Sequence, residues 1–183
     1  MNILHFDRLF VILVSLIPVT VLAGSAISLI NILLLCIHSL IVTVILNKYK
    51  IFYNKAIISL LLIYLYLFLN IFIAIDFNNS LVRNLGFIRY IFLFIGINYL
   101  FLKSKESAFL RSWLIIILIV VLDSYFEIIT GNNSLGFGND PKLFGRRIVS
   151  FFKDEPVVGA YINAFYLLLV GYLFMNYKNY SKV

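Results

Sequence analysis

Gly145–Ile162, GRRIVSFFKDEPVVGAYI, joins a charged segment directly to an apolar one. Arg146 and Arg147 form an adjacent basic pair, and the acidic pair Asp154 and Glu155 follows eight residues later. A guanidinium group binds phosphate oxygens with two parallel N–H bonds and stays charged at every relevant pH, which makes arginine better suited than lysine to a phosphate site. This stretch therefore predicts a site for an anionic group, placed where the chain turns apolar.

The apolar segment that follows, Val157–Met175, is long enough to cross a bilayer. Pro156 precedes it and is typical of the first turn of a helix, where its missing N–H would be unpaired in any case. We therefore expect the charged residues to lie at a membrane surface, beside the positive end of a helix dipole. An anionic lipid headgroup is favoured at such a place.

Composition extends this interpretation to the whole chain. The 183 residues are 63% hydrophobic and 13% charged, which leaves too little polar surface to cover a soluble globule. The apolar residues form continuous blocks without alternation of polar and apolar positions, so we expect spanning helices and exclude an outer-membrane barrel. The sequence therefore predicts an integral membrane protein of the all-α class.

The apolar blocks give the expected helices. We predict a polytopic transmembrane bundle of about six helices, in which residues 1–183 form a single transmembrane domain. Gly24 and Ser25 suit a tight turn between the first two blocks, although the short first block also leaves open a signal peptide cleaved after Ala23. The blocks are Leu9–Ala23, Ala26–Leu46, Ala56–Ile75, a segment from Leu81 or Leu85 to Leu102, Phe109–Ile129 and Val157–Met175.

The distribution of cations predicts the orientation. With the N-terminus in the cytoplasm, the short loops on that side carry only two acids, Asp7 and Glu106, and most of the cations, as the positive-inside rule requires. Both termini are then cytoplasmic, and the net charge of +7 is a topology signal that gives no argument for nucleic acid binding. The cations on that side are Arg8, Lys48, Lys50, Lys55, Lys103, Lys105, Arg111, Lys178 and Lys182.

One connection is much longer than the others and lies on the opposite side, from about Thr130 to Glu155. A connection of this length is expected to be folded by its own turns or by a ligand. Its glycines do not fit the spacing of a nucleotide-binding P-loop, which excludes that class.

The order of motifs around this loop resembles the O-antigen polymerase and O-antigen ligase superfamily (Wzy-type proteins). The elements that carry the resemblance are Asp123 near the end of the fifth helix, Thr130-Gly131, Arg146 or Arg147, Ser150-Phe151-Phe152, Asp154-Glu155 and Gly159-Ala160-Tyr161. The glycine that commonly follows the serine of this run is absent. Such proteins have further helices and a second periplasmic loop, so the chain resembles their N-terminal half, and activity of these residues alone is in doubt.

The resemblance implies a glycosyltransferase of the bacterial inner membrane, with polymerase favoured over ligase by the acidic pair. It would transfer a glycan from an undecaprenyl-pyrophosphate carrier to a saccharide hydroxyl at the periplasmic face. Its partners would be the undecaprenyl-pyrophosphate-linked oligosaccharide, the lipid bilayer, and a C-terminal half or a chain-length regulator. No cofactor and no metal is implied.

Each candidate residue has more than one interpretation. Arg146 and Arg147 are predicted to bind pyrophosphate or to anchor in the interface, whereas Asp154 and Glu155 are predicted to orient or deprotonate the acceptor hydroxyl or to cap the next helix. Arg89 lies inside an apolar helix, where a charge commonly faces a bundle interior, and it is predicted to bind substrate, to snorkel or to pair with Asp123.

The remaining candidates have mainly structural interpretations. Asp123 and Glu127 lie four residues apart on one helical face and are expected to pair with arginine. Arg83 is expected to pair with Asp76. His38 is expected to be a packed, hydrogen-bonding residue, with proton transfer as the less favoured alternative. Trp113 is expected in the interfacial belt. The alternative functions are a membrane transporter or flippase component, and an inactive truncated membrane subunit.

Overall fold

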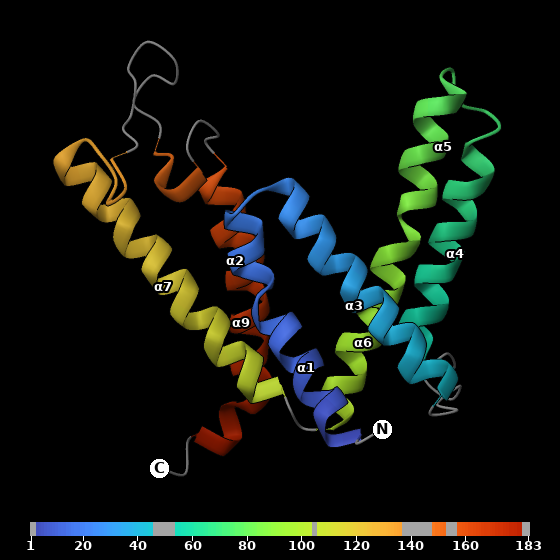
Figure 1. Ribbon diagram of the computed structural model, residues 1–183, viewed down its shortest axis with the longest axis horizontal. Coiled ribbons are helices and arrows are strands. Elements are labelled where there is room, and N and C mark those ends of the chain that lie inside the picture. The colour runs from blue at the N-terminus through green and yellow to red at the C-terminus, as the bar shows by residue number, and fades with distance from the viewer. Residues whose placement is uncertain (1–2, 46–53, 104–105, 137–147, 153–156, 181–183) are drawn as a thin grey trace. The chain divides into compact units, whose positions relative to one another are not determined.

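A computed structural model describes residues 3–45, 54–103, 106–136, 148–152 and 157–180. These residues are helical, with no strand among them (Figure 1). The chain divides into two compact units, one of Met1–Ile17 with Ser28–Glu106 and one of Pro18–Ile27 with Ser107–Val183. Each unit is described by itself.

The described residues of the first unit form five helices. α1 packs against α3 and α6 through Phe10 and Asp7. α4 lies alongside α5 and also contacts α6 (Figure 1). Their bounds are α1 Ile3–Ser15, α3 Ser25–Ile45, α4 Lys55–Asn70, α5 Phe77–Gly86 and α6 Ile88–Leu102.

Phe10 is the centre of the packing between α1, α3 and α6. Its fully buried ring stacks on His38 of α3, with ring centroids 4.4 Å apart and planes within 7°. On α6, Gly96 lies so close to Phe10 and Ser39 that a Cβ atom at this position would overlap both side chains. The expected packing of His38 is confirmed, and α6 depends on glycine to approach its neighbours.

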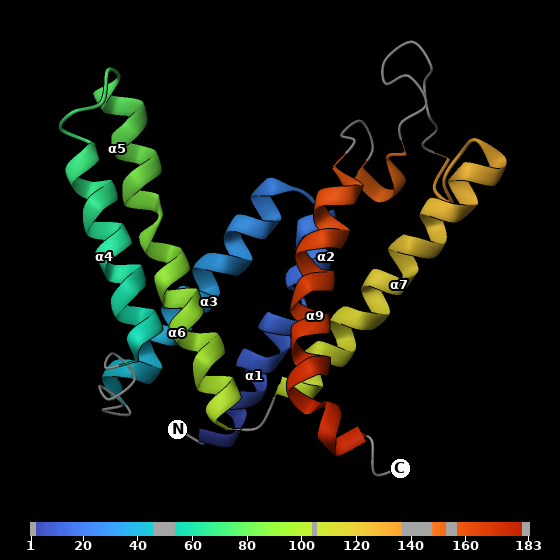
Figure 2. The ribbon, with the colours of Figure 1, turned by 180° about the vertical axis from the view of Figure 1, so that it is seen from behind.

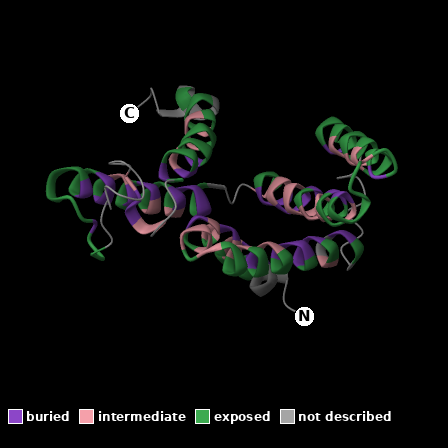
Figure 3. Ribbon diagram, turned by 90° about the horizontal axis from the view of Figure 1, so that it is seen from above, coloured by how far each residue is buried: buried purple, intermediate pink, exposed green. Residues whose placement is uncertain are grey.

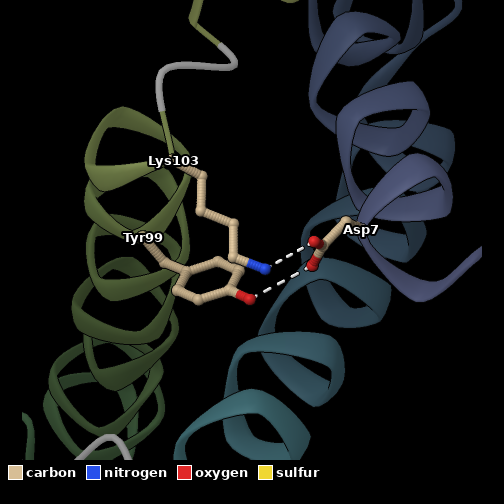
Figure 4. Close-up of polar contacts among 3 residues, drawn as sticks. All are labelled: Asp7, Tyr99 and Lys103. Atoms are coloured by element: carbon tan, nitrogen blue, oxygen red, sulfur yellow. Dashed lines mark hydrogen bonds and ion pairs between the residues drawn. The ribbon is translucent and has the colours of Figure 1, made fainter. Parts of the chain in front are cut away.

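An ion pair joins the beginning of α1 to the end of α6. The Lys103 Nζ lies 2.5 Å from Oδ2 of the buried Asp7, and the Tyr99 hydroxyl donates to Oδ1 at 3.1 Å (Figure 4). Partial burial acts to lower the pKa of Lys103, but its hydrogen bonds with Asp7 and Tyr99 outweigh this and raise the pKa above its ordinary value. The ammonium group therefore stays charged at neutral pH, and it partners a carboxylate that would be costly to bury alone.

Polar side chains define the turn between α4 and α5. Asp76 is the N-cap of α5, accepting from the Asn79 backbone N–H at 3.1 Å and from its side-chain amide. Asn84 donates from α5 to the Leu67 carbonyl in α4 at 2.9 Å. The predicted ion pair between Asp76 and Arg83 is therefore wrong, because the Asp76 carboxylate is used as a helix cap.

The boundaries of these helices also differ from the prediction. The third predicted helix ends at Asn70, five residues before the predicted Ile75, and the fourth begins at Phe77. The cap at Asp76 explains the early start, because its side chain satisfies an N–H that would otherwise be unpaired. A break at Phe87 then separates α5 from α6.

The second unit is built on α7 (Glu106–Thr130) and α9 (Val158–Tyr180), with α2 (Ile17–Leu22) and the short 3₁₀ helix η2 (Ser150–Phe152) (Figure 2). Aromatic rings connect α7, α9 and η2: Phe109 with Trp113, Trp113 with Phe165, Phe165 with Tyr161, and Tyr161 with Phe152. The Tyr161 hydroxyl also donates to the Pro18 carbonyl at 3.2 Å.

Trp113 belongs to this aromatic cluster and is only 4% exposed. Its predicted place in an interfacial belt is wrong, because the ring packs between Phe109 and Phe165 inside the unit. Edge-to-face ring pairs of this kind stabilise a core beyond the area they bury.

Proline and glycine divide the first apolar block. The predicted helix Leu9–Ala23 is interrupted at Leu16, because the Pro18 ring has no N–H and clashes with a preceding carbonyl in a continuous helix. Gly24 has φ +118°, a conformation that favours glycine, and it turns the chain into α3. The predicted turn at Gly24 and Ser25 is confirmed.

Within the described residues, two helical segments are long and apolar enough to cross a membrane: α5 together with α6, Phe77–Leu102, and Ser107–Thr130 of α7. Shorter apolar helices are Ser25–Ile41, Lys55–Asn70 and Val158–Phe174. Large apolar side chains are exposed along these helices, as the burial colouring in Figure 3 makes visible. The described residues therefore form an all-helical protein, and some of its helices are suited to a membrane.

Candidate functional site

The C-terminal end of α7 is shaped by a turn that directs the chain back toward the helix. Gly131 has φ +84°, and its N–H donates to the Glu127 carbonyl at 2.8 Å, so it closes the last turn of α7. Asn133 Oδ1 then accepts the Leu135 N–H at 3.1 Å in a tight side-chain turn. These contacts bring Ser134 beside the last two turns of α7.

Two buried carboxylates of α7 hold both described ends of the long loop. Asp123 accepts the Ser134 N–H at 3.0 Å through Oδ1 and the Ser150 hydroxyl at 2.6 Å through Oδ2. Glu127 accepts the Val149 N–H at 3.1 Å and the Ser150 N–H at 2.7 Å, one on each oxygen. We name Asp123 and Glu127 with these four donors the carboxylate clamp.

Ser150 is the most constrained residue of the clamp. It is fully buried, and its φ of +46° lies in the left-handed region, where a side chain is unfavourable. Its N–H and hydroxyl bind the two carboxylates, and its carbonyl accepts from the Asn133 amide. Hydrogen bonds to charged groups contribute about 1.5–3 kcal/mol each, enough to hold a strained residue in place.

The buried surroundings of the clamp strengthen these hydrogen bonds. Asp123 is 6% exposed and Glu127 is 3% exposed. All four protein groups donate to carboxylate oxygens, which is the arrangement that an ionised carboxylate requires. The expected pairing of these acids with arginine is replaced, among the described residues, by bonds to backbone N–H groups and a hydroxyl.

This geometry assigns the two acids a positioning role. Both acids are buried, and each of their four carboxylate oxygens accepts a hydrogen bond from the returning chain. Their effect is to fix the chain on both sides of the segment between Gly136 and Ile148.

An apolar pocket of about 480 Å³ lies next to the clamp in the same unit. Leu135 and Phe151, which directly follow the clamp residues Ser134 and Ser150, form part of its wall. The other lining residues are Val19, Leu22 and Ala23 of the α2 segment and Ile116, Ile119 and Val120 of α7. A pocket of this size is within the range that binds small apolar ligands.

Four of the five predicted site residues, Arg146, Arg147, Asp154 and Glu155, lie outside the described residues. Their predicted roles therefore stay predictions. In sequence, Arg147 precedes the first clamp residue of the returning chain, Val149, by two positions, and Asp154 follows Ser150 by four.

Arg89, the fifth, belongs to the first unit and lies in the first turn of α6. It is half-buried, and one guanidinium nitrogen lies 3.3 Å from the Tyr90 hydroxyl, with the group 5.0 Å from the centre of that ring. The buried Nε makes no hydrogen bond within the described part of the chain. This arginine is thus held on an aromatic face and keeps hydrogen-bonding capacity.

Sequence reasoning placed Asp123 and Ser150 in one motif but missed their direct hydrogen bond and the roles of Asn133 and Ser134. The signal available was the pair of acids four residues apart at a helix end, directly before a turn rich in glycine and asparagine. Backbone N–H groups are their main partners, and these carry no sequence signature.

Comparison of the chain with protein-family models, with curated proteins and with solved structures gives no match. The clamp and the pocket beside it therefore carry the functional argument.

Proposed function

We propose that this protein is an inner-membrane component of surface polysaccharide polymerisation, of the O-antigen polymerase and ligase kind. It binds an undecaprenyl-pyrophosphate-linked oligosaccharide at the periplasmic face and takes part in transfer of the glycan to a saccharide acceptor. The observation that carries the proposal is the hydrogen bond between Asp123 and Ser150. It joins two elements of the motif that are 27 residues apart in sequence.

The clamp supports this function because it holds the described parts of the long connection against α7. Both ends of the loop are fixed on α7, at Ser134 and at Val149 with Ser150. Arg146 and Arg147 immediately precede the second fixed end in sequence. A charged site needs a scaffold that limits its motion, since preorganised groups stabilise developing charge without reorganising.

The proposed reaction creates negative charge on a leaving lipid pyrophosphate. Arg146 or Arg147 neutralises that charge with a bidentate contact, and Asp154 or Glu155 orients or deprotonates the acceptor hydroxyl. The apolar pocket beside the clamp suits the first isoprene units of the carrier lipid.

The proposed topology has six spans and both termini in the cytoplasm. The helices that could cross a membrane, Phe77–Leu102 and Ser107–Thr130, fit this arrangement, and the cation distribution of the loops favours it. In this orientation the clamp faces the periplasm, where lipid-linked oligosaccharides are joined.

The test uses point variants of the chromosomal copy in the producing cell and compares the length distribution of its surface polysaccharide on a gel. At matched membrane levels, the arginine that binds pyrophosphate should lose most polymer when changed to lysine, whereas an anchoring arginine should tolerate the change. Arg146→Lys and Arg147→Lys should therefore differ from each other.

Two outcomes would refute the proposal. Normal polymer length in a strain that lacks the protein indicates that it has no role in polymerisation. Altered flux of a solute or of lipid-linked oligosaccharide, with polymer chemistry intact, indicates a transporter or flippase component instead.

A further inference from the structure

Residues of α7 and α9 line a second apolar groove, near the N-terminal end of α7 and therefore away from the clamp. Figure 2 shows the ribbons of these two helices. The volume of the groove is about 310 Å³. The residues from α7 recur every three or four positions and the three from α9 do the same, so each helix offers one face to the groove. They are Ser107, Leu110, Arg111, Leu114 and Ile115 of α7, and Leu169, Tyr172 and Leu173 of α9.

The polar residues that α7 contributes to this groove lie at one end of its wall. Ser107 and Arg111 lie in the first two turns of α7, while Leu114 and Ile115 continue the wall further along the helix. From Ser107 to Ile115 the wall extends for roughly 12 Å along α7, at 1.5 Å per residue. The groove thus has one cationic end and an apolar length.

Arg111 is exposed, and it forms no ion pair with a carboxylate whose side chain the structure describes. It lies within a helix that is apolar enough to span a bilayer, about one turn from its start. An arginine at this depth extends its guanidinium toward the headgroup layer, where phosphate is the available anion.

We propose that this groove binds an anionic glycerophospholipid, with one acyl chain along the apolar wall and the phosphate at Arg111. Arg111 matches the charge of an anionic headgroup, and the apolar helix faces match a lipid acyl chain. One phospholipid molecule therefore fits both parts of the groove. The inference goes beyond the proposed function, and it requires only that α7 and α9 lie in a bilayer.

The experiment measures lipid binding to the purified whole chain by native mass spectrometry, with phosphatidylglycerol and phosphatidylcholine of identical acyl chains. The wild type should bind phosphatidylglycerol more tightly, and Arg111→Gln should reduce that affinity about fivefold, the effect of one basic residue near anionic lipid. Arg111→Lys, which keeps the charge, should bind as the wild type does. Arg83→Gln removes an exposed cation elsewhere and is the matched control.

A second pair of variants tests the acyl wall without changing charge. Leu173→Trp fills the groove and should weaken binding of both lipids, whereas Leu167→Trp, on an exposed position of α9 outside the groove, should not. Equal binding by Arg111→Gln and the wild type would overturn the proposal, as would an unaffected Leu173→Trp. In a third test, Leu114→Cys places a thiol in the groove. If this thiol forms a specific disulfide with a second copy of the chain, protein fills the groove, and the lipid proposal is overturned.

Discussion

Ser150 combines an unfavourable backbone conformation with three hydrogen bonds inside the second unit. The left-handed region costs a residue with a side chain about 1–2 kcal/mol, and the bonds to Asp123, Glu127 and Asn133 offset that cost. Backbone strain of this kind persists only where the surroundings overdetermine it. The conformation of Ser150 is therefore a consequence of the clamp.

Two substitutions of Ser150 distinguish the effect of its hydroxyl on stability from the effect of its backbone strain. Ser150→Ala and Ser150→Gly both lose the bond to Asp123, but glycine adopts φ +46° without steric cost. We expect Ser150→Gly to be more stable than Ser150→Ala by about 1 kcal/mol in the free energy of unfolding. Denaturant titration in detergent measures the difference, and equal stabilities would show that the strain is absent.

Loss of a clamp carboxylate should release the loop while leaving α7 in place. Asp123→Ala removes two hydrogen bonds to a charged group, so we expect trypsin to cleave after Arg146 or Arg147 at least about tenfold faster. Leu122→Ala, on the neighbouring exposed position, is the control and should cleave at the wild-type rate. Identical rates for the two variants would contradict the role of the clamp.

At the scale of the helix, α6 depends on Gly96 for its close approach to α1 and α3. A Cβ atom there would overlap the buried Phe10 ring and the Ser39 hydroxyl, which is itself bonded to the Leu35 carbonyl. We expect Gly96→Ala to destabilise the protein by about 1–3 kcal/mol, the usual cost of overpacking.

The matched control for Gly96 is Gly171 in α9, where a Cβ atom would meet no other atom within 4 Å. Gly171→Ala should be neutral or stabilising by about 0.5–1 kcal/mol because alanine favours helix. Thermal unfolding in detergent compares the two variants. Equal shifts in the unfolding temperature of both variants would show that α6 does not approach α1 and α3 through Gly96.

Sequence alone predicted the helices better than their ends. The apolar block Phe109–Ile129 corresponds closely to α7, because polar residues bound it on both sides. Phe72–Ile75 are equally apolar yet lie beyond α4, since composition does not reveal that the Asp76 cap begins another helix. Trp113 was misplaced for a related reason: its partner Phe165 is distant in sequence.

The candidate site was predictable only in part. Asp123 and Ser150 were found by motif order, but the clamp depends on N–H groups of Ser134 and Val149, which every residue possesses. These contacts join residues far apart in sequence, so they depend on how the chain returns to α7 after the helix ends. No single residue specifies that return, because several weak turn signals determine it jointly.

At the scale of the molecule, orientation in the membrane is the first property to measure. A single cysteine at Asn132, an exposed position after α7, should react with an impermeant thiol reagent added outside the cell. One at Lys55, the exposed first residue of α4, should react only after permeabilisation. Asn133 is unsuitable because its side chain is buried and holds Ser150. The reverse labelling pattern would invert the proposed topology.

The ion pair between Asp7 and Lys103 also has a consequence for biosynthesis. Asp7 leaves the ribosome 96 residues before Lys103, an interval of roughly 5–20 s at ordinary rates of chain elongation. During that interval the nascent first helix has the acid without the ammonium group that accompanies it in the finished protein, and a lone carboxylate resists entry into lipid. In the proposed membrane arrangement, we therefore expect α1 to reach its final position only after α6 has emerged, so the beginning of the chain is placed late.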